Sequence, residues 1–131
     1  MDIVLRPLLL SRAGIRVLVM KAVLVSDGKA LAVDVSVAES LVARMRGLLG
    51  RSFLPAGHAL LIRPCKGIHT FFMRFSIDAV FLDKDNRIVA LYHSLPPNRM
   101  TAVYCKAHSV LELPAGTLDA DLEVGEGIEF F

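Results

Sequence analysis

The sequence lacks long apolar runs and has few cysteines. Every apolar stretch is interrupted by Arg, Lys or Asp before it reaches the roughly 20 residues that a membrane-spanning helix needs. The sequence therefore predicts no membrane span. Two cysteines, Cys65 and Cys105, are too few for a disulfide scaffold, and we expect reduced thiols, although a single bridge would still be compatible with the count.

The chain also lacks a strong charge excess. Its formal net charge is +2, from 15 basic and 13 acidic residues. Residues 1–21 hold four of the basic residues and one of the acidic ones, so the remainder has 11 basic and 12 acidic residues. A nearly neutral body does not predict a nucleic-acid partner.

The N-terminal segment does not have the pattern of an export signal. Arg6, Arg12 and Arg16 interrupt the unbroken apolar stretch that a signal peptide requires. We interpret residues 1–19 as an extension that leads into a first strand, and residues 20–131 as one domain. This interpretation favours a cytoplasmic protein.

Hydrophobic residues make up 54% of the 131 residues, which is enough to bury a core. One helix is predicted at about 36–50. Ser36 and Glu39 have the spacing of a capping box, and an apolar stripe recurs at three- and four-residue intervals after them. The stripe consists of Ala38, Leu41, Val42, Met45, Leu48 and Leu49.

Most of the remaining sequence is typical of short strands separated by turns. The predicted strands are 23–25, 30–35, 58–63, 71–82, 87–92, 109–113 and 128–131. Asp27-Gly28 and Asp83-Lys84-Asp85-Asn86 have the composition of turns, and the second of them defines a hairpin at about 71–92. The predicted fold class is mainly β: an antiparallel sandwich or barrel with one packed helix.

Three segments together resemble the prokaryotic "domain of unknown function 192" family. They are Arg46-Gly47-Leu48-Leu49-Gly50-Arg51, the stretch from His69 to Asp83 (HTFFMRFSIDAVFLD), and Val110-Leu111-Glu112-Leu113-Pro114-Ala115-Gly116. The match spans about two-thirds of the chain and occurs in the same order. The resemblance implies a jelly-roll-like β fold with one packed helix, and it implies no established activity.

The sequence departs from the commonest form of this family at two points. Ser76 stands where proline is frequent, and the segment after Met73 is shorter. The chain is more similar to a subset that carries Cys-x-x-x-His-Thr-Phe, here Cys65 to Phe71.

Two Cys/His pairs flank the predicted hairpin: Cys65 with His69, and Cys105 with His108. Thiolates and imidazoles suit zinc, and the four residues could close a tetrahedral site if a turn forms at 64–67. A cysteine beside a histidine could also serve as an activated nucleophile. The alternative is that the same residues are structural, since cysteine often packs as a small hydrophobic residue.

A second set of polar residues could bind a ligand. Arg74 and Asp78 are four residues apart, hence on one face of a regular strand, and Arg46 and Arg51 lie near the C-terminal end of the predicted helix. They could grip an anion or carboxylate, or form an ordinary ion pair. With His69 and Met73, which lie beside them in sequence, they complete the candidate ligand-binding residues: Arg46, Arg51, His69, Met73, Arg74 and Asp78.

The sequence contains no phosphate-binding glycine loop, no dinucleotide fingerprint and no hydrolase signature. We therefore expect a binding or accessory module rather than an enzyme, with a small molecule or a protein as partner and no resident cofactor. Its site is expected near residues 69–78 and the loop at 96–108. The alternatives are a zinc-binding domain and a Cys/His-dependent enzyme.

Overall fold

The computed structural model describes residues 9–10, 16–17 and 20–131. Strands β1 (Leu9–Leu10) and β2 (Arg16–Val17) form a short antiparallel pair. The other parts of the predicted extension lie outside the described residues. No helix in the described part of the chain has the length and apolarity that a membrane crossing requires.

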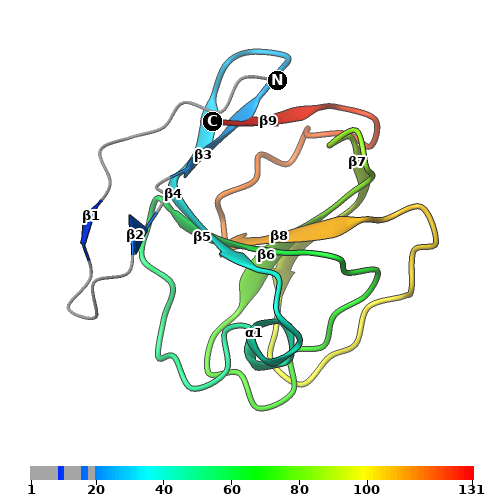
Figure 1. The fold of residues 1–131 in the computed structure, drawn as a ribbon. Coiled ribbons are helices and arrows are strands. Elements are labelled where there is room, and N and C mark those ends of the chain that lie inside the picture. Colours follow the sequence, from blue (N-terminus) through cyan, green and yellow to red (C-terminus); the bar gives the residue numbers. More distant parts are fainter. Residues whose placement is uncertain (1–8, 11–15, 18–19) are drawn as a thin grey trace.

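Seven strands form one curled sheet in the order β7-β6-β8-β5-β4-β3-β9 (Figure 1). They are β3 (Met20–Leu24), β4 (Ala30–Ala38), β5 (His58–Ile62), β6 (Ile77–Leu82), β7 (Ile88–Leu95), β8 (Ser109–Pro114) and β9 (Ile128–Phe130). The two edges of the sheet approach each other where Arg87, just before β7, bridges to Gly127, just before β9. The mainly β fold class is thus confirmed, and of the two predicted forms the curled sheet is closer to a barrel than to two facing sheets.

The strand pairing explains where the helix lies. Neighbouring strands are antiparallel except β4 and β5, which run parallel. A parallel pair needs a long crossover connection, and residues 39–57 supply it. This crossover carries helix α1 (Leu41–Arg46) across the outer face of the sheet.

The predicted helix is present, but it begins later and ends earlier than the sequence pattern suggested. Ser36 lies in β4, so the predicted capping box is wrong. The N-cap is Ser40, whose hydroxyl accepts a hydrogen bond from the backbone N–H of Ala43 at 3.1 Å. Gly47 ends the helix with φ 49°, a conformation that favours glycine.

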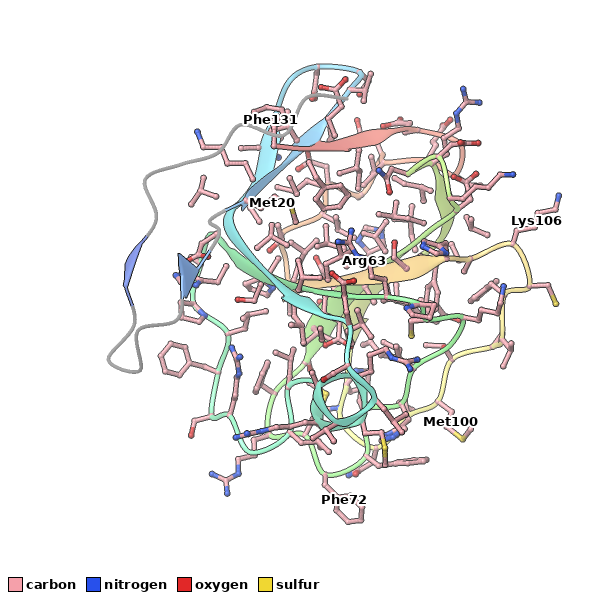
Figure 2. The ribbon with its side chains drawn as sticks, in the orientation of Figure 1. Met20, Arg63, Phe72, Met100, Lys106 and Phe131 are labelled. Atoms are coloured by element: carbon pink, nitrogen blue, oxygen red, sulfur yellow. The ribbon has the colours of Figure 1, made fainter. Side chains whose placement is uncertain are left out.

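Half of the predicted apolar stripe is exposed. Leu41, Val42 and Met45 are exposed, whereas Leu48 in the turn after the helix is buried. Phe72 is another exposed apolar side chain, which points away from the body at the same end of the molecule as α1 (Figure 2). Sequence periodicity identified the helix but not the side that faces the sheet.

Both faces of the central strands are covered. Along β6, Val80 and Leu82 join the core inside the curl, while Ile77, Ala79 and Phe81 join clusters on the outer face. All six residues of β6 are therefore buried. The same alternation in β8 places Leu111 and Leu113 inside and directs Glu112 toward the outer face.

Two long connections cover the outer face beside α1. Residues 63–76 precede β6, and residues 96–108 join β7 to β8. The predicted strand at 71–82 thus begins only at Ile77. The two connections are joined by backbone hydrogen bonds from Tyr104 to Lys66, Thr101 to Ile68 and Thr70 to Arg99, and Thr70 is completely buried.

Candidate functional site

Glu112 is the least expected feature of the outer face. It lies on β8 between Leu60 of β5 and Ala79 of β6, and the residue is only 4% exposed. Its Oε2 atom has no hydrogen-bond partner among the described residues. Burial raises the pKa of Glu112 to about 7, so this carboxyl changes its charge near neutral pH.

A crevice of about 150 Å³ opens above this carboxyl. Its walls come from α1 with the following turn and from the connection that leads to β6. The residues that line it are Arg44, Met45, Arg46, Gly47, Leu48, Leu49, Ile62, Pro64, Cys65, Gly67, Ile68, His69, Met73 and Glu112. The crevice thus combines apolar walls with a few polar groups, a composition typical of small-molecule sites.

Arg44 provides a second unpaired polar atom in the same crevice. One terminal nitrogen of its guanidinium donates to the carbonyl oxygen of Pro64 at 3.2 Å. Its Nε is buried and has no partner within the described part of the chain. Two residues that line the crevice therefore each have a buried polar atom without a partner in the described part of the chain, and such groups are uncommon in folded proteins.

Cys65 lies in the electrostatic field of both groups. Burial raises the pKa of its thiol and the negative charge of Glu112 adds to this rise, while a backbone hydrogen bond with Gly67 and the charge of Arg44 oppose it. The Sγ atom is 3.2 Å from the carbonyl oxygen of Gly67, as a donated S–H bond requires. The raised pKa favours the thiol over the thiolate, the opposite of what an activated nucleophile needs.

The predicted zinc site is not formed. Residues 20–131 contain no group of three or more His, Cys, Asp or Glu side chains that could hold a metal ion. Both cysteines are free thiols. Cys65 is half-buried in the crevice, whereas Cys105 and His108 are exposed on the connection between β7 and β8. The main chains of Cys65 and His108 are hydrogen-bonded, but this contact does not bring the four side chains together.

Three of the six predicted ligand-binding residues line the crevice: Arg46, His69 and Met73. The His69 ring is stacked on Phe71 at 5.1 Å, and its Nδ1 accepts from the backbone N–H of Phe71 at 3.3 Å. Arg51 and Arg74 are exposed and do not line it.

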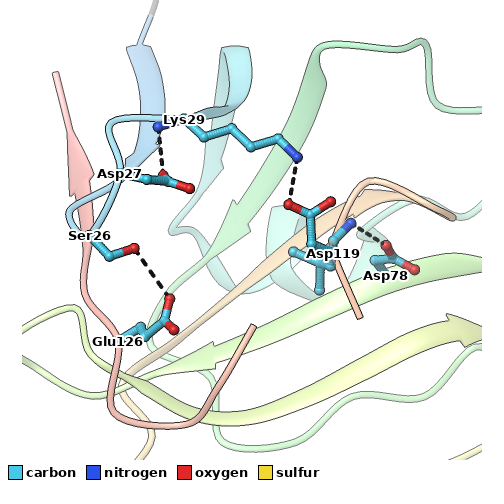
Figure 3. Close-up of polar contacts among 7 residues, drawn as sticks. Ser26, Asp27, Lys29, Asp78, Asp119 and Glu126 are labelled. Atoms are coloured by element: carbon cyan, nitrogen blue, oxygen red, sulfur yellow. Dashed lines mark hydrogen bonds and ion pairs between the residues drawn. The ribbon is translucent and has the colours of Figure 1, made fainter. Parts of the chain in front are cut away.

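The buried carboxylate of Asp78 supports the fold by bonding to backbone groups. It is 0% exposed, and its carboxylate accepts from the backbone N–H groups of Ser94 at 2.7 Å and Leu118 at 2.9 Å. Figure 3 shows the bond from Leu118, beside the ion pair of Lys29 with Asp119. Arg74 lies in the connection before β6 rather than on the strand, so the predicted shared strand face with Asp78 is wrong.

Sequence reasoning missed Glu112 and Arg44. Glu112 is the one charged residue in the apolar run from Val110 to Leu113, and an isolated charge in such a run is the signal that could have identified it. Arg44 carried no comparable signal, because an arginine near a helix end is ordinary on a solvated surface.

The three segments that carry the family resemblance converge on the crevice. The first supplies Arg46, Gly47, Leu48 and Leu49, the second His69 and Met73, and the third Glu112. These segments are separated along the chain and meet because β5, β8 and β6 are adjacent in the sheet and α1 lies over them.

Comparison with solved structures supports the fold. A proposed transcription regulator of Sinorhizobium meliloti superposes with a TM-score of 0.70 at 20% identity, over 85% of this chain and 91% of that one. A protein of unknown function from Novosphingobium aromaticivorans gives 0.73 at 15% identity, over 98% and 93%. At these identities the likeness shows the fold alone.

Sequence comparison gives the family. A UPF0127 protein of Pyrococcus furiosus is 30% identical over 112 residues, which cover 81% of this chain and 94% of the relative. A UPF0127 protein of Pyrococcus horikoshii is 32% identical over 104 residues, covering 75% and 88%. The family model DUF192, described as "Uncharacterized ACR", matches residues 22–130. The family prediction is thus confirmed, and the chain belongs to the DUF192 family.

Proposed function

We propose that this protein is a binding module that takes a small polar molecule into the crevice above Glu112. The observation that carries the proposal is that Glu112 lines the crevice while its buried Oε2 atom has no hydrogen-bond partner among the described residues. An unpaired buried polar group destabilises a fold by roughly 1–3 kcal/mol. A ligand that donates a hydrogen bond to Glu112 removes this penalty, so binding and stability are coupled at this position.

The size of the crevice limits the ligand. A closed cavity of about 150 Å³ accommodates a molecule of the size of benzene, and the crevice has a comparable volume. It is also open to solvent on one side, so a ligand somewhat larger than benzene fits. The walls favour a molecule with apolar atoms in the middle and polar groups at its ends.

A thiol enzyme is the weaker interpretation of the same crevice. Cys65 and His69 both line it, but the raised pKa of Cys65 keeps the thiol protonated at neutral pH. The Nδ1 of His69 accepts a hydrogen bond from its own connection rather than from the thiol. The geometry therefore supports binding better than nucleophilic catalysis.

The proposal is tested by mapping where small polar compounds bind. A library of such fragments is titrated into isotope-labelled protein, and amide and methyl chemical shifts are recorded. We expect a chemically related subset to shift Gly47, Gly67, Ile62 and Met73, and to bind at least several-fold more weakly to Glu112→Gln.

The matched control is Glu129→Gln, which neutralises an exposed carboxylate on β9, away from the crevice. Fragment binding should be unchanged in this variant. Shifts that never gather around the crevice, or binding that is equal in Glu112→Gln and wild type, would contradict the proposal.

A further inference from the structure

Two unpaired buried atoms of opposite polarity define what the crevice can recognise. Nε of Arg44 is a donor, and Oε2 of Glu112 accepts when the carboxyl is ionised. Both residues line the same crevice, and both influence the thiol of Cys65. A ligand that satisfies both atoms therefore needs an acceptor at one end and a donor at the other.

The Arg44 end favours a carboxylate. One terminal nitrogen donates to the carbonyl of Pro64, and Nε has no partner among the described residues. A planar carboxylate matches a guanidinium edge in both shape and charge. Arg46 also lines this part of the crevice and adds a second positive charge.

The Glu112 end favours an ammonium or hydroxyl group. The flanking residues on β5 and β6 are Leu60 and Ala79, which offer no polar side-chain atom. The other titratable and charged residues that line the crevice are Arg44 and Arg46 from α1, and Cys65 and His69 from the connection. A donor brought in by the ligand fills the place that none of these groups occupies.

Most of the other residues that line the crevice are apolar. Leu48, Leu49, Ile62, Ile68 and Met73 line the crevice, and they can contact a short chain of methylene groups. We propose, building on the binding function above, that the ligand is a short ω-substituted carboxylic acid: its carboxylate is held by Arg44, and its terminal amino or hydroxyl group donates to Glu112.

The test uses four probes that differ only at their ends. They are 4-aminobutyrate, 4-hydroxybutyrate, butyrate, which lacks the donor, and n-butylamine, which lacks the carboxylate. Dissociation constants are measured on the full chain by chemical-shift titration at pH 6 and pH 8. We expect at least one of the two bifunctional probes to bind about tenfold or more tightly than butyrate and butylamine, since a hydrogen bond to a charged group is involved at each end.

The pH series separates the two donor types. Because Glu112 ionises near neutrality, the affinity for the ammonium probe should rise from pH 6 to pH 8. The affinity for the hydroxyl probe should not rise in this way, because a neutral hydroxyl gains less from the charge. If the affinity for 4-aminobutyrate rises with pH, the ligand is an amino acid. If 4-hydroxybutyrate binds more tightly and its affinity does not rise in this way, the ligand is a hydroxy acid.

Two variants assign the ends. Glu112→Gln should remove the advantage of the bifunctional probe over butyrate, and Arg44→Gln should remove its advantage over butylamine. Arg44→Lys keeps the charge and should restore part of the affinity lost in Arg44→Gln. If either variant fails to fold, the four-probe comparison on the wild-type protein decides alone.

The inference is overturned if butyrate or butylamine binds as tightly as both bifunctional probes, or if none of the four probes binds. It is also overturned if inorganic phosphate binds the crevice with a lower dissociation constant than both bifunctional probes. The proposed binding function is still supported after these outcomes if the fragment screen finds a ligand of other chemistry that binds in the crevice and depends on Glu112. Failure of both experiments rejects both proposals.

Discussion

Replacing Glu112 by glutamine should change the pH dependence of stability. The carboxyl is almost completely buried, and burial raises its pKa from 4.5 to about 7 in the folded protein. The folded state therefore binds the Glu112 proton more tightly than the unfolded state does. Stability from this residue is fully present below about pH 4.5 and is lost as the pH rises to about 7, because the unfolded chain then ionises first.

The size of this effect follows from the difference in pKa. Each pKa unit corresponds to about 1.4 kcal/mol, so the rise from 4.5 to about 7 corresponds to about 3 kcal/mol of stability lost across this interval. A domain of this size is stabilised by roughly 5–15 kcal/mol in total, so the effect is readily measured. Glu112→Gln has nearly the same shape and cannot ionise, so it should lack this loss.

The assay is urea denaturation of wild type and Glu112→Gln at intervals between pH 5 and pH 8. We expect the free energy of unfolding of the wild type to fall by about 2–3 kcal/mol relative to the variant over this range. Glu129→Gln, on exposed β9, should follow the wild type. A difference between wild type and Glu112→Gln that does not vary with pH would refute the description of Glu112 as a buried carboxyl with a raised pKa.

Three further predictions concern other parts of the fold. Asp78→Ala should reduce the free energy of unfolding by about 2–4 kcal/mol, because two backbone N–H groups lose their acceptor, and Asp78→Asn should cost less; equal values in a urea titration would contradict this. Ser40→Ala should cost about 1 kcal/mol and Ser36→Ala close to none, since Ser40 is the N-cap, and the reverse order in thermal unfolding would restore the predicted capping box. In single-cysteine variants treated with iodoacetamide at pH 7.5, exposed Cys105 should react about tenfold or more faster than Cys65, whose thiol pKa is raised; similar rates would show that Cys65 is accessible and ionised.

Much of the strand pattern could be predicted because it depends on local chemistry. The turn at Asp27-Gly28 separates β3 from β4 as expected, and the polar turn at 83–86 connects β6 to β7. The last strands also lie where their flanking Pro and Gly residues indicated. The beginning of β6 was misplaced because Phe71, Phe72 and Phe75 have strong strand propensity, while the backbone there is committed to the other connection through Thr70.

The helix illustrates a different limit. An apolar stripe predicts which residues share one side, but the side that becomes buried depends on how the crossover from β4 to β5 places the helix on the sheet. The sequence analysis chose Ser36 as the cap, four residues before the actual N-cap Ser40, because Ser36 becomes part of β4 only through its pairing with β5.

The site was predictable in part. Arg46, His69 and Met73 were identified as candidates and line the crevice, although whether they bind a ligand stays a prediction. Asp78 was predicted to bind a ligand or to pair with Arg74, whereas its carboxylate accepts from backbone N–H groups of two distant segments. The four-residue Cys/His cluster failed because Cys105 and His108 lie exposed on the loop from β7 to β8, whereas Cys65 lies in the crevice.

The sequence by itself determined the family, the β-rich fold class and the positions of most strands, because turn chemistry, hydrophobic alternation and the three family segments are local properties of the chain. The tertiary structure alone decided that those three segments meet at one crevice, and that Glu112 and Arg44 lie unpaired within it. The physical reason is that burial and hydrogen-bond satisfaction depend on neighbours contributed by other strands and loops. An isolated glutamate in an apolar strand therefore shows its raised pKa and its missing partner only when β5, β6 and α1 close around it.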